Sequence, residues 1–248
     1  MKTSNKLLLT ALIVLLCSLA AYNMVVKSAY ETGAYKDPLG NHVQLGFEGF
    51  DEVDVNATNM LRVKIEAGDA FAVYQQKDTE ELIQVTQEGN RLKVDLVLPD
   101  EKTALGGFRT SFHVVIRTPA VKSIRANAVH TAAGKPTTTR HKLYAPNYFG
   151  LLIEGFRQEH LQLELDNGSH VQLAGNQIGT LQATTGRSAG SEPLLQLLPN
   201  NKLQQTDLNI RNGSYLELQN VPVPQLRYTF SDSAHVSLSG ASLASFRQ

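Results

Sequence analysis

The chain has 248 residues, with 23 basic and 23 acidic side chains and a single cysteine. This balance argues against the one-signed electrostatic field that favours nucleic acid, and one thiol excludes an intramolecular disulfide. Tryptophan is absent and apolar residues make up 42 % of the chain, enough for a core of aliphatic side chains. We therefore expect one large or two small domains and no nucleic-acid partner.

Residues 7–26 form an uncharged apolar run that two lysines precede and Lys27 closes. Twenty helical residues span about 30 Å, the thickness of a bilayer core, so residues 1–27 are expected to be a signal anchor with one transmembrane helix. The lysines on the short N-terminal side predict an inside N-terminus and an exported, periplasmic body. The alternative is a signal peptide cleaved at the small-x-small site of residues 18–20, which would leave the body secreted or surface-exposed.

Residues 28–42 are expected to be a polar linker, and residues 43–120 a β-rich N-terminal part of the body, either irregular coils or a capping sheet. Alternating or β-branched segments predict strands at 50–55, 61–65, 71–74, 82–85, 92–98 and 112–116. The stretch 99–110 is expected to be a loop, and no amphipathic helix is predicted after the apolar run.

Residues 121–248 follow a regular spacing of turn residues. These turn residues are Asn127, Asn147, Asn167, Arg187, Asn212 and Asp232, spaced by 20 residues except for one step of 25. A period of this length in alternating strands predicts an all-β parallel β-helix, a regular β-solenoid with coils of about 20 residues.

Within each expected coil, alternation assigns an inward and an outward face. Apolar residues such as Leu163 and Leu173 recur at even offsets from the turn and are expected to point inward. The turn asparagines suit left-handed corners and can hydrogen-bond to one another between coils. Residues 187–198 lack asparagine, contain Pro193 and carry the five extra residues, which predicts a bulging loop.

Three histidines share one place in the spacing, three residues after the turn. His130, His170 and His235 stand there together with Tyr215, and alternation predicts that this row faces outward. Stacking would leave His130 and His170 roughly 10 Å apart, whereas a shared zinc ion needs nitrogens at about 2 Å. The row is therefore interpreted as a solvated or contact surface, and no metal-binding residue is assigned.

Paired carboxylates were considered because parallel β-helices include polysaccharide lyases and glycosidases. Glu164 and Asp166 are expected to point outward, Glu159 lies near a corner and Glu217 occupies a different position in its coil. Such enzymes need acids close together on one outer face, and the sequence indicates no convergent set. No catalytic or cofactor-binding residue and no cofactor are assigned, and we expect the protein not to be an enzyme.

The start of the body carries a family resemblance. Residues 46–55 (GFEGFDEVDV), residues 61–65 (LRVKI) and the turn at 68–69 resemble the start of the auto-transporter adhesin head (GIN) domain family, common in Bacteroidetes envelopes. The resemblance extends over about residues 43–240 and implies a β-helical exported domain with an adhesin role, without catalytic residues. The chain departs from that pattern at residues 187–198 and in its membrane anchor.

Together these features predict a non-enzymatic, exported envelope protein that residues 7–26 tether to the cell membrane in a single pass. Its adhesin-head-like domain is expected to bind glycan or an envelope protein. A carbohydrate-active enzyme, a polysaccharide lyase or glycosidase on a β-helix, is the alternative. A structural or sensory module that couples the envelope to a partner is a third hypothesis.

Overall fold

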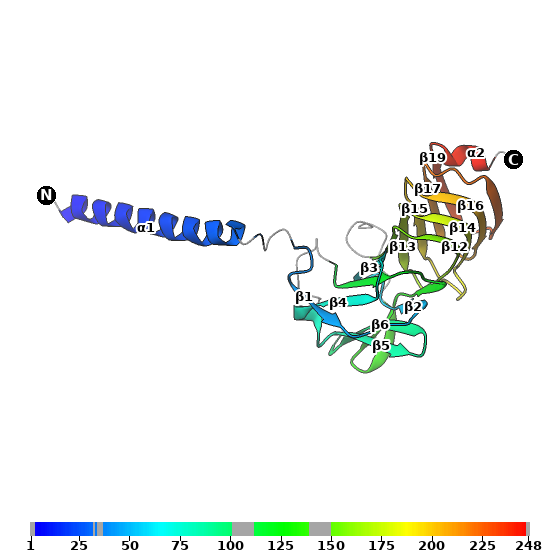
Figure 1. Ribbon diagram of the computed structural model, residues 1–248, viewed down its shortest axis with the longest axis horizontal. Coiled ribbons are helices and arrows are strands. Elements are labelled where there is room, and N and C mark those ends of the chain that lie inside the picture. Colours follow the sequence, from blue (N-terminus) through cyan, green and yellow to red (C-terminus); the bar gives the residue numbers. More distant parts are fainter. Residues whose placement is uncertain (1–2, 32, 34–36, 101–111, 139–149, 247–248) are drawn as a thin grey trace. The chain divides into compact units, whose positions relative to one another are not determined.

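The computed structural model describes residues 3–31, 33, 37–100, 112–138 and 150–246 (Figure 1). The chain forms two compact units, Met1–Asn41 and His42–Gln248. Most of the loop expected at 99–110 and the turn expected at Asn147 lie outside the described residues.

The first unit contains one long helix, α1 (Thr3–Glu31). Its span Thr3–Ser28 is long and apolar enough to cross a membrane, and none of its most apolar stretch is buried within the protein. Leucine side chains such as Leu7 are exposed on all sides, which a water-soluble surface helix would not tolerate. The expected N-terminal apolar helix is therefore confirmed, and its properties are those of a signal sequence or a membrane anchor.

The second unit contains two large sheets and two short helical segments, η2 (Lys77–Thr79) and α2 (Ser242–Ser245). The nine-stranded sheet has the spatial order β1 (His42–Leu45), β4 (Ala72–Gln76), β7 (Val114–Thr118), β3 (Arg62–Ala67), β11 (Gly150–Glu154), β13 (His170–Ala174), β15 (Leu194–Leu197), β17 (Tyr215–Gln219) and β19 (His235–Ser239). The ten-stranded sheet has the order β10 (Lys135–Thr138), β9 (Val129–Ala132), β6 (Arg91–Leu98), β2 (Glu52–Val55), β8 (Ser123–Ala126), β12 (Arg157–Leu165), β14 (Gln177–Thr185), β16 (Lys202–Ile210) and β18 (Gln225–Phe230), with β5 (Ile83–Glu88) paired to β6.

These two sheets correct the expected β-solenoid, because the strands do not close into coils. Both sheets are mixed: β4 pairs with β1 and β7, β9 with β10, and β5 with β6 in antiparallel fashion, whereas most other pairs are parallel. From β11 to β19 the chain passes alternately between the two sheets, so strands about 20 residues apart pair side by side, as Leu151 does with Val171 (Figure 1). Sequence spacing cannot distinguish this arrangement from a closed coil.

The core lies between the sheets and follows the alternation of side chains. Leu163 is 1 % exposed and Leu173 0 %, which confirms the expected inward face. The six strands expected before residue 120 are present within a few residues of their predicted bounds, as β2 to β7. The core thins at the β18–β19 end, where Tyr228 is 50 % exposed and Val236 39 %.

Two of the turn asparagines adopt the expected left-handed conformation, Asn167 with φ of 54° and Asn212 with φ of 51°. The Asn167 side-chain amide donates to Oδ1 of Asn127 at 3.1 Å, a hydrogen bond of the kind predicted between neighbouring turns. The bulge expected at residues 187–198 is shorter than predicted. Its apolar end forms β15, which pairs with β13 and β17, so only residues 187–193 leave the sheets.

Candidate functional site

The outward histidine row predicted from the sequence is present only in part. Parallel register places His170, Tyr215 and His235 in one row together with Leu194, but His170 is buried and His130 is not in the row. His130 is 5 % exposed and lies on β9 of the ten-stranded sheet, whereas His170 is 8 % exposed and lies on β13 of the other sheet. His170 Nε2 lies 2.7 Å from Oε1 of Gln196. Tyr215 and His235 do lie side by side, with stacked rings whose centroids are 4.5 Å apart. His130 is outside the row because β9 forms a hairpin with β10 in the other sheet.

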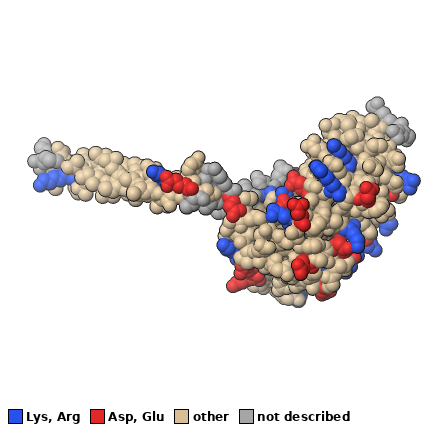
Figure 2. Space-filling model, in the orientation of Figure 1, with Lys and Arg blue, Asp and Glu red and all other residues tan. Residues whose placement is uncertain are grey.

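Within the described residues, no group of three or more histidine, cysteine, aspartate or glutamate side chains is placed to hold a metal ion. Many charged side chains of the body instead pair with each other. On the face shown in Figure 2, acidic and basic side chains lie next to one another and do not separate into one-signed areas. A ligand-binding site is therefore expected where polar groups keep unused hydrogen-bonding capacity.

The outer face of β6, β2, β8 and the end of β12 carries charges that neutralise one another, and we call it the paired region. Arg91 Nη2 lies 2.7 Å from Oε2 of Glu52 on the neighbouring strand. Arg125 lies between two carboxylates, 3.6 Å from Asp54 Oδ2 and 3.4 Å from Glu164 Oε2. The structure thus brings together Asp54 and Glu164, which are far apart in the sequence.

A hollow of about 360 Å³ opens in the paired region, beside Asp54, Arg125 and Glu164. Arg187 also binds Glu164, at 3.0 Å, and Asp166 accepts a hydrogen bond from the Ser188 hydroxyl at 2.6 Å. Burial raises the pKa of the Asp54 carboxyl, although Arg125 and Arg91 act in the opposite direction. These carboxylates already have partners within the protein.

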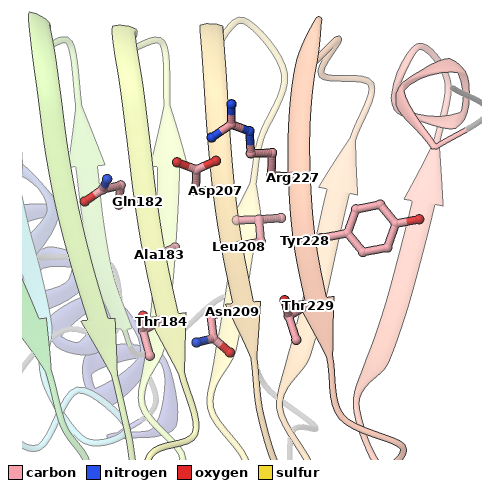
Figure 3. A pocket seen from close by; sticks show the side chains of 9 residues that line it. All are labelled: Gln182, Ala183, Thr184, Asp207, Leu208, Asn209, Arg227, Tyr228 and Thr229. Carbon is pink, nitrogen blue, oxygen red and sulfur yellow. The ribbon is translucent and has the colours of Figure 1, made fainter.

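A second hollow, of about 410 Å³, lies on the outer face of β14, β16 and β18, and we call it the strand-end hollow (Figure 3). Parallel register sets its polar side chains in two rows across the strands. The first row is Gln182, Asp207 and Arg227, and the second is Thr184, Asn209 and Thr229. Ala183 and Leu208, which separate the rows, are buried beneath the sheet.

The charged groups of the strand-end hollow are not paired with each other. Asp207 accepts one hydrogen bond through Oδ2, from the Gln205 amide at 3.2 Å. Its Oδ1 is buried and has no hydrogen-bond partner among the described residues. Arg227 likewise makes no hydrogen bond or ion pair with any part of the chain that the structure describes. This combination places an unsatisfied carboxylate oxygen, buried in this conformation, next to a guanidinium group on the adjacent strand.

The sequence interpretation did not single out these residues, although a signal exists. Gln182, Asp207 and Arg227 each stand five positions before a turn residue, at Arg187, Asn212 and Asp232. The offsets used for the apolar face were even, so the odd offsets define the polar outer rows. The polar residue types at those offsets would have predicted the first row of the strand-end hollow.

Comparisons with known proteins place the fold. No family model matches the chain, and no curated protein matches its sequence. Among solved structures, a "putative adhesin" from Parabacteroides distasonis superposes with a TM-score of 0.55 at 10 % identity, covering 80 % of this chain and 73 % of that one. A "putative lipid binding protein" from the same organism has a TM-score of 0.40 at 8 % identity, covering 81 % and 94 %. A "putative adhesin" from Bacteroides fragilis has a TM-score of 0.34 at 14 % identity, covering 80 % of this chain and 93 % of that one.

The first of these structures shares the fold of this chain, and the other two TM-scores are too low to support an inference. The chain thus shares a fold with a structure named a "putative adhesin", while no family match confirms the GIN domain family expected from the sequence. Ten per cent identity carries no ligand or residue role to this chain.

Proposed function

We propose that this chain is an exported, membrane-tethered envelope protein that binds a glycan in the strand-end hollow and catalyses no reaction. The adhesin-head-like fold and the apolar helix α1 support the general assignment. One observation carries the choice of ligand. Beside the unpaired Arg227, the Asp207 carboxylate keeps a buried oxygen without a donor among the described residues.

An unsatisfied buried acceptor costs about 1–3 kcal/mol. A ligand that supplies a donor to Asp207 Oδ1 recovers that free energy once the side chains that cover this oxygen move aside. Sugar hydroxyl groups both donate and accept. They can therefore donate to Asp207 and accept from Arg227 and from the Gln182 amide, which stand in the same row. The threonine and asparagine side chains of the second row add further partners at the spacing of the strands, about 4.8 Å.

The size of the hollow favours a glycan over a protein partner. A volume of about 410 Å³ lies within the range of small-molecule sites, about 300–1,000 Å³. A stable protein interface buries about 1,200–2,000 Å² around an apolar centre, whereas the outward side chains here are amides, hydroxyls and charges.

A glycan array probed with the full chain in detergent micelles tests the proposal. Arg227→Ala should weaken binding of the best array ligand at least tenfold, because a hydrogen bond to a charged group contributes about 1.5–3 kcal/mol. Arg91→Ala is the matched control. It stands in the same row of the same sheet but pairs with Glu52, so it should change the affinity less than twofold.

Equal affinities of wild type and Arg227→Ala would refute a site in the strand-end hollow. Absence of binding to every glycan on the array would refute glycan binding as the function.

The membrane tether is tested separately by mass and fractionation. We expect the mature protein to retain residues 7–26 and to sediment with membranes, with its body open to protease added from the periplasmic side. Loss of about twenty N-terminal residues would establish the alternative, a signal peptide cleaved near residues 18–20.

A carbohydrate-active enzyme remains the second candidate, and its observation is the paired region. Asp54 and Glu164 face the same guanidinium, and burial raises the pKa of Asp54, a property of general acids. A binding function is favoured over an enzymatic one, because Arg125 together with Arg91 and Arg187 compensates the charges of these carboxylates. Release of reducing ends by the wild type, and its loss in Asp54→Asn, would decide for the enzyme.

A further inference from the structure

A third hollow lies on the same outer face, at the beginning of β12, β14 and β16. It has a volume of about 650 Å³, and Pro222 and Pro224 form part of its wall. Arg157, Gln177 and Lys202 stand in one row across it, in parallel register. We call it the strand-start hollow. Gln182 is five residues after Gln177 on β14, and the alternation is interrupted between them, because Ile178 and Leu181 are both buried. The two rows therefore lie at most about 17 Å apart.

The two cations of this row have no partner among the residues that the structure describes. Arg157 and Lys202 are exposed, and neither makes a hydrogen bond or ion pair with any residue that the structure describes. Strand spacing places their backbones about 10 Å apart, with the Gln177 amide between them. Most other charged side chains on this sheet are compensated by a neighbour, as Arg91 and Arg125 are. The row is thus a local concentration of uncompensated positive charge.

One acid at the strand-start hollow limits where an anion can lie. The Glu159 side chain lies over Gly179, since a Cβ atom added at Gly179 would be 2.7 Å from Glu159 Oε2. A ligand anion would be repelled there and attracted at the row of Arg157 and Lys202, two residues earlier on each strand. Glu159 can instead accept hydrogen bonds from neutral hydroxyl groups.

We propose that the strand-start hollow is a subsite for an acidic sugar, in which Arg157 and Lys202 bind a carboxylate or sulfate group. This inference rests on the proposed glycan-binding function and makes it specific. The ligand is an oligosaccharide that runs along β14 and β16, with its acidic unit on the two cations and a neutral unit in the strand-end hollow. The guanidinium and ammonium groups provide donors only, and the Gln177 amide between them can add an N–H donor, which suits an anion.

Matched pairs of oligosaccharides test the inference on the full chain in detergent micelles. The probes are oligogalacturonate with its methyl ester, and a sulfated chondroitin oligosaccharide with its desulfated form. Wild type should bind one acidic form at least tenfold more tightly than its partner at low salt, and the preference should shrink as salt is added. The pair that shows the preference identifies the anion as carboxylate or sulfate.

The double variant Arg157→Ala/Lys202→Ala should lose this preference while keeping its affinity for the neutral form. The variant Lys77→Ala/Lys135→Ala removes the same net charge elsewhere on the body and should keep the preference. Equal affinity of wild type for both forms of both pairs would overturn the acidic subsite, and so would a preference that survives in the double variant. In either case loss of binding in Arg227→Ala would still support the proposed function. Failure of all four probes to bind would also overturn the inference.

Discussion

The outer face of the ten-stranded sheet differs between its two ends, although one row of residues crosses both. At the β6–β2 end, Arg91 lies 2.7 Å from Glu52 and the charges compensate each other. At the β16–β18 end of the same row, Asp207 and Arg227 stand next to each other in register without an ion pair between them. The paired charges stabilise contacts between neighbouring strands, whereas the unpaired ones remain available to a ligand. The comparison shows that charge content alone does not locate a binding surface.

The largest expected effect is the unfolding of the whole body, including both ends of the sheet, because the two ends share one core. Leu173 is 0 % exposed between the sheets. Leu173→Asp buries a charge without a partner, which costs several kcal/mol, and should leave the body unfolded by circular dichroism. Ser237→Asp, at an exposed strand position, should fold normally. A folded Leu173→Asp variant would show that the core is more tolerant than its burial indicates.

Acid should destabilise the protein through His113, which lies next to β7 of the nine-stranded sheet, whereas the paired region belongs to the ten-stranded sheet. His113 is 6 % exposed and accepts a hydrogen bond at Nδ1 from the Arg62 backbone amide at 2.9 Å. Burial lowers the pKa of His113 from 6.5 to about 4, and the positive charge of Arg62 acts in the same direction.

Since the folded pKa is the lower one, the unfolded chain binds a proton between pH 6.5 and pH 4 that the folded protein does not. The contribution of neutral His113 to the free energy of unfolding is therefore complete above about pH 6.5 and is lost as the pH falls towards 4. The shift in pKa corresponds to a loss of about 3 kcal/mol. Denaturant unfolding across this range should show the loss in wild type and a smaller loss in His113→Asn, whose side chain can still accept from Arg62. If the free energy of unfolding falls with pH as steeply in the variant as in wild type, other groups cause the acid sensitivity. The exposed His160, replaced by Gln, provides the control.

The smallest expected effect is a difference in stability between a substitution in the paired region and one in the strand-end hollow. Arg125→Ala leaves Asp54 and Glu164 without their shared partner, and should lower the free energy of unfolding by about 1 kcal/mol, because the group is partly exposed. Arg227→Ala should change it by less than about 0.5 kcal/mol, since it breaks no ion pair. Glycan affinity should show the reverse order. If Arg227→Ala is as destabilising as Arg125→Ala, the two ends do not differ in the way described.

Much of the local structure could be predicted from the sequence. Period-2 alternation identified the strands before residue 120 and the inward face that contains Leu163 and Leu173. Asparagine at Asn167 and Asn212 correctly indicated left-handed corners. These features depend on residues close together in the chain, where side-chain direction and backbone preference suffice.

The partners of each strand could not be predicted in the same way. β11 pairs with β3, so Leu151 lies opposite Val63, and β8 lies between β2 and β12. No spacing in the sequence indicates these pairs, because alternation shows which face is buried and leaves open which strand lies beside it. The same gap led to two predictions that the structure corrects, the closed β-solenoid and the place of His130 in the histidine row.

By itself, the sequence determined the apolar N-terminal helix, the strands, their inward faces and two of the corners, all of which follow from local patterns. Only the tertiary structure decided that the strands form two open sheets, that Arg125 reaches both Asp54 and Glu164, and that Asp207 and Arg227 stand together unpaired. The physical reason is that hydrogen bonds between strands join residues distant in the chain, so the sheet order sets which charges meet and which remain open to a ligand.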